Sequence, residues 1–166
     1  MAIPDYFTLY ELPQSFHPDA AAVRRQYYVL SRQYHPDRFA AAEAADYAEV
    51  LRMSALNNEA YRTLGDEDRT MGYILKLNGI VEDEEAYKLP PAFLMDMMEL
   101  NEAVDEGGEG AVGSWQSAVG LWQSEVGPLM KRFDEGERSP ELFAALKDYY
   151  YRKKYLLRIG GRLGGM

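Results

Sequence analysis

Apolar residues recur along this chain at the spacing of helical faces. Between residues 20 and 34, apolar side chains fall at i, i+4, i+7 and i+11, and this periodicity is typical of an amphipathic helix. These side chains belong to Val23, Tyr27, Leu30 and Tyr34. The chain has no long alternating run bounded by hairpin dipeptides, so the signals for strands are weak. The pattern predicts an all-helical (all-α) protein.

Capping residues, prolines and glycines divide the pattern into seven helices. Asp19 is a good N-cap residue, and Pro36 stops the helix that follows it. Gly65 is placed to end the next helix, and Ser139 with Pro140 marks the start of the last one. The predicted helices cover residues 6–11, 20–34, 41–64, 69–77, 91–106, 114–133 and 140–159.

The acidic stretch VEDEEAYKLPP follows the fourth predicted helix and reads as a linker. It separates an N-terminal helical hairpin from three further helices, so we expect two small helical domains. The chain ends in GGRLGGM, which should fray. The expected boundaries are 1–78 for the N-terminal domain, 79–90 for the linker, 91–160 for a C-terminal three-helix bundle and 161–166 for a disordered tail.

Composition narrows the classes of function. The 166 residues include no cysteine, which excludes disulfides and thiolate ligands for zinc or an iron–sulfur cluster. We therefore expect no cofactor. No apolar run is long enough to cross a bilayer, and the N-terminus lacks the pattern of a secretory signal. A cytoplasmic location with no membrane partner is the expectation.

The net charge of −9 is concentrated in one part of the chain. Between Gly79 and Glu109 there are ten acidic residues and one basic residue, so this segment alone carries a charge of −9. Such a chain would repel the phosphate backbone of a duplex. We therefore do not expect nucleic acid as a partner.

The only two histidines, His17 and His35, each begin a His-Pro-Asp triplet. The first triplet precedes a helix that Asp19 can cap, so we interpret it as a helix start with no further role. The second lies between two predicted helices, at the tip of a hairpin. Pro36 fixes that turn and Asp37 stands exposed beside it. From the triplet alone, a purely structural polar turn remains an alternative.

The helix before the second triplet carries a basic face. A helical projection at 100° per residue places this face opposite the apolar stripe. A basic face is usually only a solvated one, but here it is the only cationic patch in the first half of an acidic protein. It runs toward the turn at His35. The residues of this face are Arg24, Arg25, Tyr28 and Arg32.

Residues 5 to 77 resemble a J-domain, the module that stimulates ATP hydrolysis by DnaK-type chaperones. The likeness lies in Asp5-Tyr6-Phe7-Leu9, the basic helix, His35-Pro36-Asp37 with Arg38-Phe39, and Asn57-Ala60-Tyr61-Leu64. J-domains usually carry Lys where this chain has Arg38, which keeps the charge. The resemblance implies that the basic face and the triplet bind the chaperone ATPase. The implied chaperone-binding residues are His35, Pro36, Asp37, Arg38, Arg24, Arg25, Tyr28 and Arg32.

The run KLPPAFLMDMMELNEAVDE has two distinct helical faces. Phe93, Met97, Leu100 and Val104 form one tight face, which we expect in the core. The opposite face combines large apolar residues with acids, a pattern that suits a partner-binding surface because methionine is flexible and polarizable. Burial of both faces inside the bundle is the alternative. The residues of the opposite face are Leu94, Met95, Met98, Glu99, Glu102 and Glu106.

Over nearly its whole length the chain resembles the HscB family, more closely than it resembles J-domains in general. The likeness lies in DYFTLY, the fourth element from Arg69 to Leu75, and AFLMDMMELNEAVDE, and it is weakest from about 107 to 138. In that family the J-domain meets the chaperone HscA, and the C-terminal bundle holds the iron–sulfur scaffold IscU. The implied scaffold-binding residues are Leu94, Met95, Met98, Glu99, Glu102, Glu106 and Tyr155.

Several other signals are weak. Residues 108–113 fit G-x-G-x-x-G, but a dinucleotide site needs a preceding strand. A metal site or an acid–base pair at the histidines would need convergent loops or a pocket with a nucleophile. Tyr150 and Tyr151 have no assigned role, and the loop DEGGEGAVG predicts a loose connection between two bundle helices.

We therefore expect a non-enzymatic cochaperone. It would hold IscU with the second domain and present the His35 turn and basic face to HscA, thereby stimulating ATP hydrolysis by the chaperone. Three alternatives stay open: a J-protein with another client, a structural helical adaptor, or an enzyme with a pocket around His35.

Overall fold

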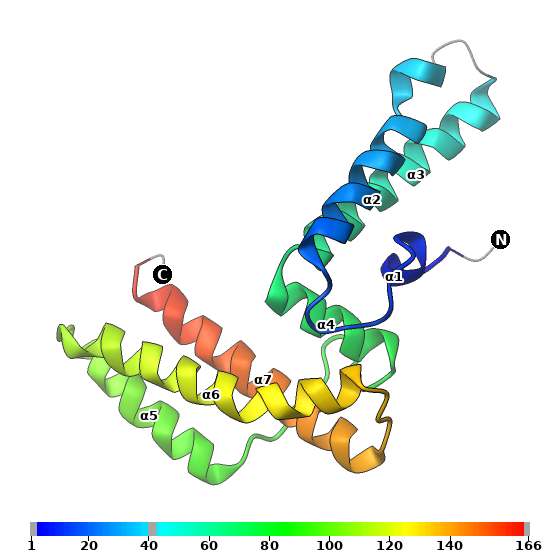
Figure 1. Ribbon diagram of the computed structural model, residues 1–166. Helices are drawn as coiled ribbons and strands as arrows, with labels where there is room; N and C mark the ends of the chain where they lie inside the picture. The colour runs from blue at the N-terminus through cyan, green and yellow to red at the C-terminus, as the bar shows by residue number, and fades with distance from the viewer. Residues whose placement is uncertain (1–2, 40–42, 165–166) are drawn as a thin grey trace. The chain divides into compact units, whose positions relative to one another are not determined.

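The computed structural model describes residues 3–39 and 43–164. These residues form seven α-helices and one 3-10 turn (Figure 1), which confirms the all-helical class. No helix in the described ranges has the length and apolar character needed to span a membrane. The elements are α1 (Tyr6–Leu9), α2 (Ala20–Gln33), η1 (Pro36–Phe39), α3 (Ala44–Leu64), α4 (Glu67–Leu77), α5 (Pro91–Asp105), α6 (Gly110–Asp134) and α7 (Pro140–Arg162).

The chain divides into two compact units, Met1–Ile74 and Leu75–Met166, and the division falls within α4. The predicted domain boundary after residue 78 and the linker over 79–90 stay predictions. Of the predicted C-terminal tail, residues up to Arg162 belong to α7, and residues 165–166 lie outside the described part. The predicted start of the third helix at residue 41 also lies outside it.

In the first unit, α2 and α3 lie side by side as a helical hairpin (Figure 1). The N-cap prediction for α2 is confirmed, because the Asp19 carboxylate accepts hydrogen bonds from the backbone N–H groups of Ala21 and Ala22. These two donors have no partner within the helix itself. Pro36 follows the end of α2 and starts the short 3-10 turn η1.

A buried polar network joins the helices of the first unit. The Tyr10 hydroxyl donates to Asn57 Oδ1 at 2.8 Å. The Asn57 amide donates to the Tyr27 carbonyl and to Ser31 Oγ, both at 3.1 Å. Asn57 is only 2% exposed, so its amide must find partners inside the protein. It finds them on α2 and on the residue that follows α1.

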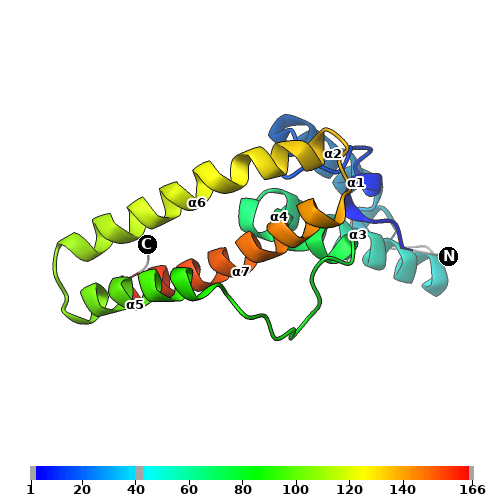
Figure 2. The ribbon, with the colours of Figure 1, turned by 90° about the horizontal axis from the view of Figure 1, so that it is seen from below.

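The second unit contains α5, α6 and α7, which form a three-helix bundle (Figure 2). The most extensive contact joins α6 and α7. Two indole N–H groups of α6 support it: Trp115 donates to the Leu156 carbonyl and Trp122 to the Tyr149 carbonyl, both at 2.7 Å. The core lies between these helices and includes Val126, Met130, Phe133, Leu142, Leu146 and Ile159.

The sequence-based bounds of α6 are wrong at its start. The helix begins at Gly110 rather than at Ser114, so the connection after α5 is shorter than the glycine-rich sequence suggests. Gly107 takes a left-handed φ of +69° just beyond α5, a position that favours glycine. Ala111 is 4% exposed. Burial of Ala111 stabilises the first turn of α6 even though glycine is a poor helix former.

The expected core face of α5 is partly confirmed. Met97 and Leu100 are buried. Phe93 and Val104 are half-buried instead, because they lie near the two ends of the helix. Their rings and methyl groups therefore contact both protein and solvent.

Candidate functional site

Two surfaces carry the residues singled out by sequence. The hairpin-tip surface lies in the first unit and the bundle surface in the second. The hairpin-tip surface consists of Arg24, Arg25, Tyr28, Arg32, His35, Pro36, Asp37 and Arg38. The bundle surface consists of Leu94, Met95, Met98, Glu99, Glu102, Glu106 and Tyr155.

The turn at His35 is held by two hydrogen bonds that backbone N–H groups donate to His35. The Asp37 N–H donates to His35 Nδ1 at 3.2 Å, and the Arg38 N–H donates to the His35 carbonyl at 3.0 Å. An accepting Nδ1 leaves the ring proton on Nε2. The side chains of His35 and Asp37 are 56% and 92% exposed. The imidazole is therefore fixed in orientation while its donor and the neighbouring carboxylate remain available to a partner.

Arg38 connects the turn to the end of α2. Its guanidinium donates to the Arg32 carbonyl at 2.8 Å. This carbonyl belongs to the last turn of α2, where the helix dipole favours a cation. Arg38 is thus a structural member of the turn as well as one of its charges.

The remaining cations of the hairpin-tip surface are exposed and unpaired. No ion pair among the described residues involves Arg24, Arg25 or Arg32. Tyr28 is 52% exposed. A hollow of about 380 Å³ is lined by Tyr28, Ser31, Arg32, His35 and Arg38. The structure therefore brings four of the predicted residues around one hollow.

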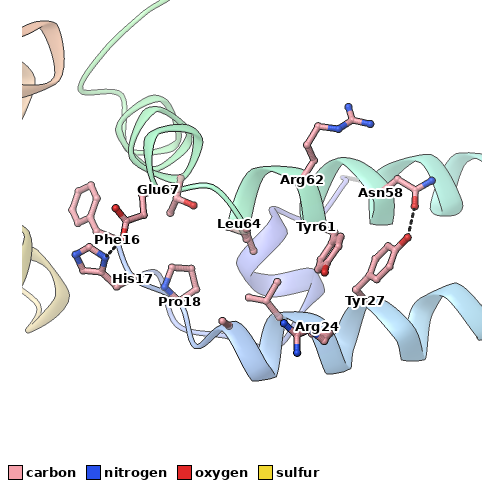
Figure 3. A pocket seen from close by; sticks show the side chains of 14 residues that line it. Phe16, His17, Pro18, Arg24, Tyr27, Asn58, Tyr61, Arg62, Leu64 and Glu67 are labelled. Carbon is pink, nitrogen blue, oxygen red and sulfur yellow. Dashed lines mark hydrogen bonds and ion pairs between the residues drawn. The ribbon is translucent and has the colours of Figure 1, made fainter. Parts of the chain in front are cut away.

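Arg24 lines a different and larger groove, of about 820 Å³, between α2 and α3 (Figure 3). The rings of Tyr27 and Tyr61 stack there at 4.1 Å. His17 closes one end, with Nδ1 3.8 Å from a carboxylate oxygen of Glu67. His17 therefore lies beside the start of α2 and not at the hairpin tip. Neither histidine belongs to a group of side chains, in the ranges described, that could hold a metal ion.

The bundle surface presents its two methionines to solvent. Met95 and Met98 are 66% and 61% exposed, so burial of both α5 faces is wrong for these residues. Glu99, Glu102 and Glu106 are also exposed. Leu94 differs from the expectation because it is half-buried. The surface combines flexible apolar groups with a row of carboxylates.

Tyr155 of α7 lies against α5. Its ring meets the ring of Phe93 edge-on, with the centroids 6.2 Å apart. The guanidinium of Arg158 lies 5.1 Å from the centroid of the Tyr155 ring. Tyr155 is thus held between the first turn of α5 and a cation of its own helix.

A contact network that sequence reasoning missed joins the acidic stretch to α7. Glu85 accepts hydrogen bonds from Lys147 at 2.7 Å and from the Tyr151 hydroxyl at 2.6 Å. The Tyr87 hydroxyl donates to Asp148 at 2.8 Å, and its ring stacks on Tyr151 at 4.6 Å. The one sign of this network in the sequence is that Asp148 and Arg152 are spaced i, i+4 on a predicted helix. In the structure, Arg152 Nε lies 2.6 Å from Asp148 Oδ2.

These contacts shift the pKa values of the groups concerned. The bonds from Lys147 and Tyr151 hold the pKa of Glu85 below its ordinary value. Burial raises the pKa of Tyr87 to about 12, and the bond to Asp148 adds to this. Burial, and then the bond to Glu85, raises the pKa of Tyr151. Tyr151 therefore has a structural role as a neutral donor.

Comparisons with known proteins show that the chain is similar in sequence to several co-chaperones. No family model matches it. It is 43% identical over 103 residues to the co-chaperone protein HscB homolog of Cupriavidus taiwanensis, a match that covers 61% of this chain and 58% of the relative. It is 38% identical over 107 residues to the homolog of Bordetella avium, covering 64% of each. These matches span about three-fifths of the relatives' own length.

Two solved structures share the fold over nearly the whole chain. Chaperone HscB from Vibrio cholerae aligns with a TM-score of 0.73 at 25% identity, covering 95% of this chain and 94% of that one. Human co-chaperone protein HscB aligns with a TM-score of 0.81 at 29% identity, covering 98% and 82%. The two units are accordingly a J-domain hairpin and a C-terminal three-helix bundle. In both sequence and fold, this chain is similar to HscB co-chaperones.

Proposed function

We propose that this protein is a J-domain cochaperone of iron–sulfur cluster assembly. It stimulates ATP hydrolysis by a DnaK-type chaperone, HscA, and binds the scaffold protein IscU. One observation carries the proposal: His35 and Asp37 are exposed in a turn that follows a helix whose arginines have no ion-pair partner in the described ranges. The homology to HscB co-chaperones supports it.

The hairpin-tip surface binds the chaperone in this proposal. Three unpaired arginines on α2 attract an acidic surface and accelerate association. The turn needs little ordering on binding, because Pro36 and the Arg38–Arg32 bond already fix it. Asp37 and the Nε2 proton of His35 then contact the partner. ATP is cleaved in the chaperone's own active site, so we assign this chain no catalytic residue and no cofactor.

The bundle surface binds the scaffold. Met95 and Met98 supply adaptable apolar contact area. Glu99, Glu102 and Glu106 surround them with negative charge, which selects a basic partner surface. Leu94 and Tyr155 are more enclosed and complete the patch. Simultaneous binding of scaffold and chaperone then couples scaffold delivery to ATP hydrolysis.

The steady-state ATPase activity of the chaperone, measured with the scaffold present, tests this proposal. We expect the unmodified protein and its His17→Gln variant to stimulate the activity and His35→Gln to leave it at the unstimulated level. His17 is the matched control because it begins the other His-Pro-Asp triplet, at a capped helix start. Failure of the unmodified protein to stimulate the chaperone would instead favour a structural adaptor.

A further inference from the structure

Arg152 of α7 contacts side chains of both α7 and α5. Its Nε donates to Asp148 Oδ2 at 2.6 Å. Its guanidinium lies 5.2 Å from the ring centroid of Phe93 on α5 and 4.8 Å from that of Tyr149. The side chain is only 24% exposed. A guanidinium that is bonded to a carboxylate and lies close to two aromatic rings has little freedom to move.

The carboxylate that holds Arg152 is itself held. Asp148 is 17% exposed, and its second oxygen accepts the hydrogen bond from the Tyr87 hydroxyl at 2.8 Å. Tyr87 belongs to the acidic stretch, which Glu85 also anchors on α7. One oxygen of Asp148 thus accepts from Tyr87 of the acidic stretch, and the other accepts from Arg152 of α7. The position of Arg152 depends on this stretch as well as on α7.

Phe93 connects Arg152 to the bundle surface. It lies in the first turn of α5, directly before Leu94 and Met95. Its other ring contact is the edge-on packing with Tyr155. Contact between α5 and α7 is less extensive than that between α6 and α7. A few side chains therefore determine how the start of α5 and the ring of Tyr155 are placed.

We propose that Arg152 is a positioning residue for the bundle surface. Held by Asp148, it fixes the ring of Phe93, and through Phe93 it sets the positions of Tyr155 and of the first turn of α5. This inference rests on the proposed binding of a scaffold to that surface. Arg152 is not one of the bundle-surface residues and need not touch the scaffold.

The test compares Arg152→Met with Arg132→Met in the full chain. Both variants remove a guanidinium that is bonded to a carboxylate at 2.6 Å within the second unit. Arg132 differs in place, because it lies near the end of α6 and bonds to Glu137, which follows that helix. Isothermal titration with IscU gives the affinity, and thermal unfolding gives the stability. We expect Arg152→Met to weaken binding by about fivefold or more and Arg132→Met to change it by less than about twofold.

A double-mutant cycle distinguishes positioning from general destabilisation. Because Arg152 acts in part through Tyr155, Arg152→Met should weaken binding less in a Tyr155→Ala background than in the unmodified chain. Additive losses in the cycle, or equal losses for Arg152→Met and Arg132→Met, would overturn the inference. Asp148→Asn provides a second variant, since it keeps an acceptor for Tyr87 but removes the charge that holds Arg152. It should reproduce the loss, and normal affinity for Asp148→Asn would also contradict the inference.

The closing control separates this inference from the proposed function. If the unmodified chain does not bind IscU at all, both the function and the inference fail. If the unmodified chain binds and Met98→Ala does not, while Arg152→Met behaves like Arg132→Met, the scaffold surface stands and only the positioning role of Arg152 fails.

Discussion

The indole ring of Trp115 on α6 lies directly against the backbone of Gly160 on α7. A Cβ atom built at Gly160 would collide with the six-membered ring of Trp115. The indole N–H donates to the Leu156 carbonyl one turn earlier. Gly160 is thus required for a close approach of the two helices, and not for an unusual backbone conformation.

This relationship predicts that Gly160→Ala destabilises the bundle. The added methyl group must displace the ring or separate the helices, which costs about 1–3 kcal/mol of unfolding free energy. Gly161→Ala is the matched control, because its Cβ meets no atom within 4 Å. That change should be neutral or stabilising by up to about 1 kcal/mol. Urea denaturation measures both, and equal values for the two variants would contradict the role of Trp115.

The buried amide of Asn57 predicts a large loss of stability in Asn57→Ala. The substitution removes the side-chain amide that accepts from the Tyr10 hydroxyl and donates to the Tyr27 carbonyl and Ser31. The Tyr10 hydroxyl keeps the backbone carbonyl of residue 57 at 2.9 Å, so the cost is that of the lost buried hydrogen bonds, about 1–2 kcal/mol. Asn58→Ala changes the exposed neighbour, whose bond with Tyr27 is 3.3 Å long, and should cost less than about 0.5 kcal/mol. Denaturant titration measures the unfolding free energies of Asn57→Ala and Asn58→Ala and tests whether they differ as expected.

The lowered pKa of Glu85 predicts a pH dependence of stability. Its folded-state pKa lies below the ordinary value of 4.5 because Lys147 and Tyr151 bond to the carboxylate. The ionised group therefore stabilises the folded protein fully above pH 4.5, and this contribution is lost as the pH falls through the lower folded-state pKa. The stability difference between the unmodified protein and Glu85→Gln should be constant near neutral pH and shrink below pH 4.5. A difference that stays constant down to acid unfolding would contradict the assignment.

The exposure of Met98 predicts a loss of scaffold affinity without a loss of stability. Met98→Ala removes a large exposed apolar group from the bundle surface, and we expect affinity for IscU to fall about tenfold. Leu121→Ala is the control, since Leu121 is 60% exposed on α6 and lies outside that surface. Thermal unfolding should change little in either variant. Unchanged affinity for IscU in Met98→Ala would favour a J-protein with a different client.

Local patterns allowed much of this protein to be predicted. The helical period, the Asp19 cap and the stop at Pro36 depend on residues within a few positions of one another, and the structure agrees with them. The exposure of Met95 and Met98 also follows from the helical projection of α5 alone. Interactions between residues that are close in the sequence determine such features, so they can be predicted from the sequence alone.

The sequence therefore determined by itself the helices, the exposed turn at His35 and the two faces of α5. The tertiary structure alone decided which distant residues meet. The pairing of Glu85 with Lys147 and Tyr151, the half-burial of Leu94 and the place of Arg152 between Asp148 and Phe93 all join segments far apart in the chain. The early start of α6 at Gly110 likewise depends on burial of Ala111. Packing overrides local propensity at these positions, because the free energy comes from side chains that only the fold brings together.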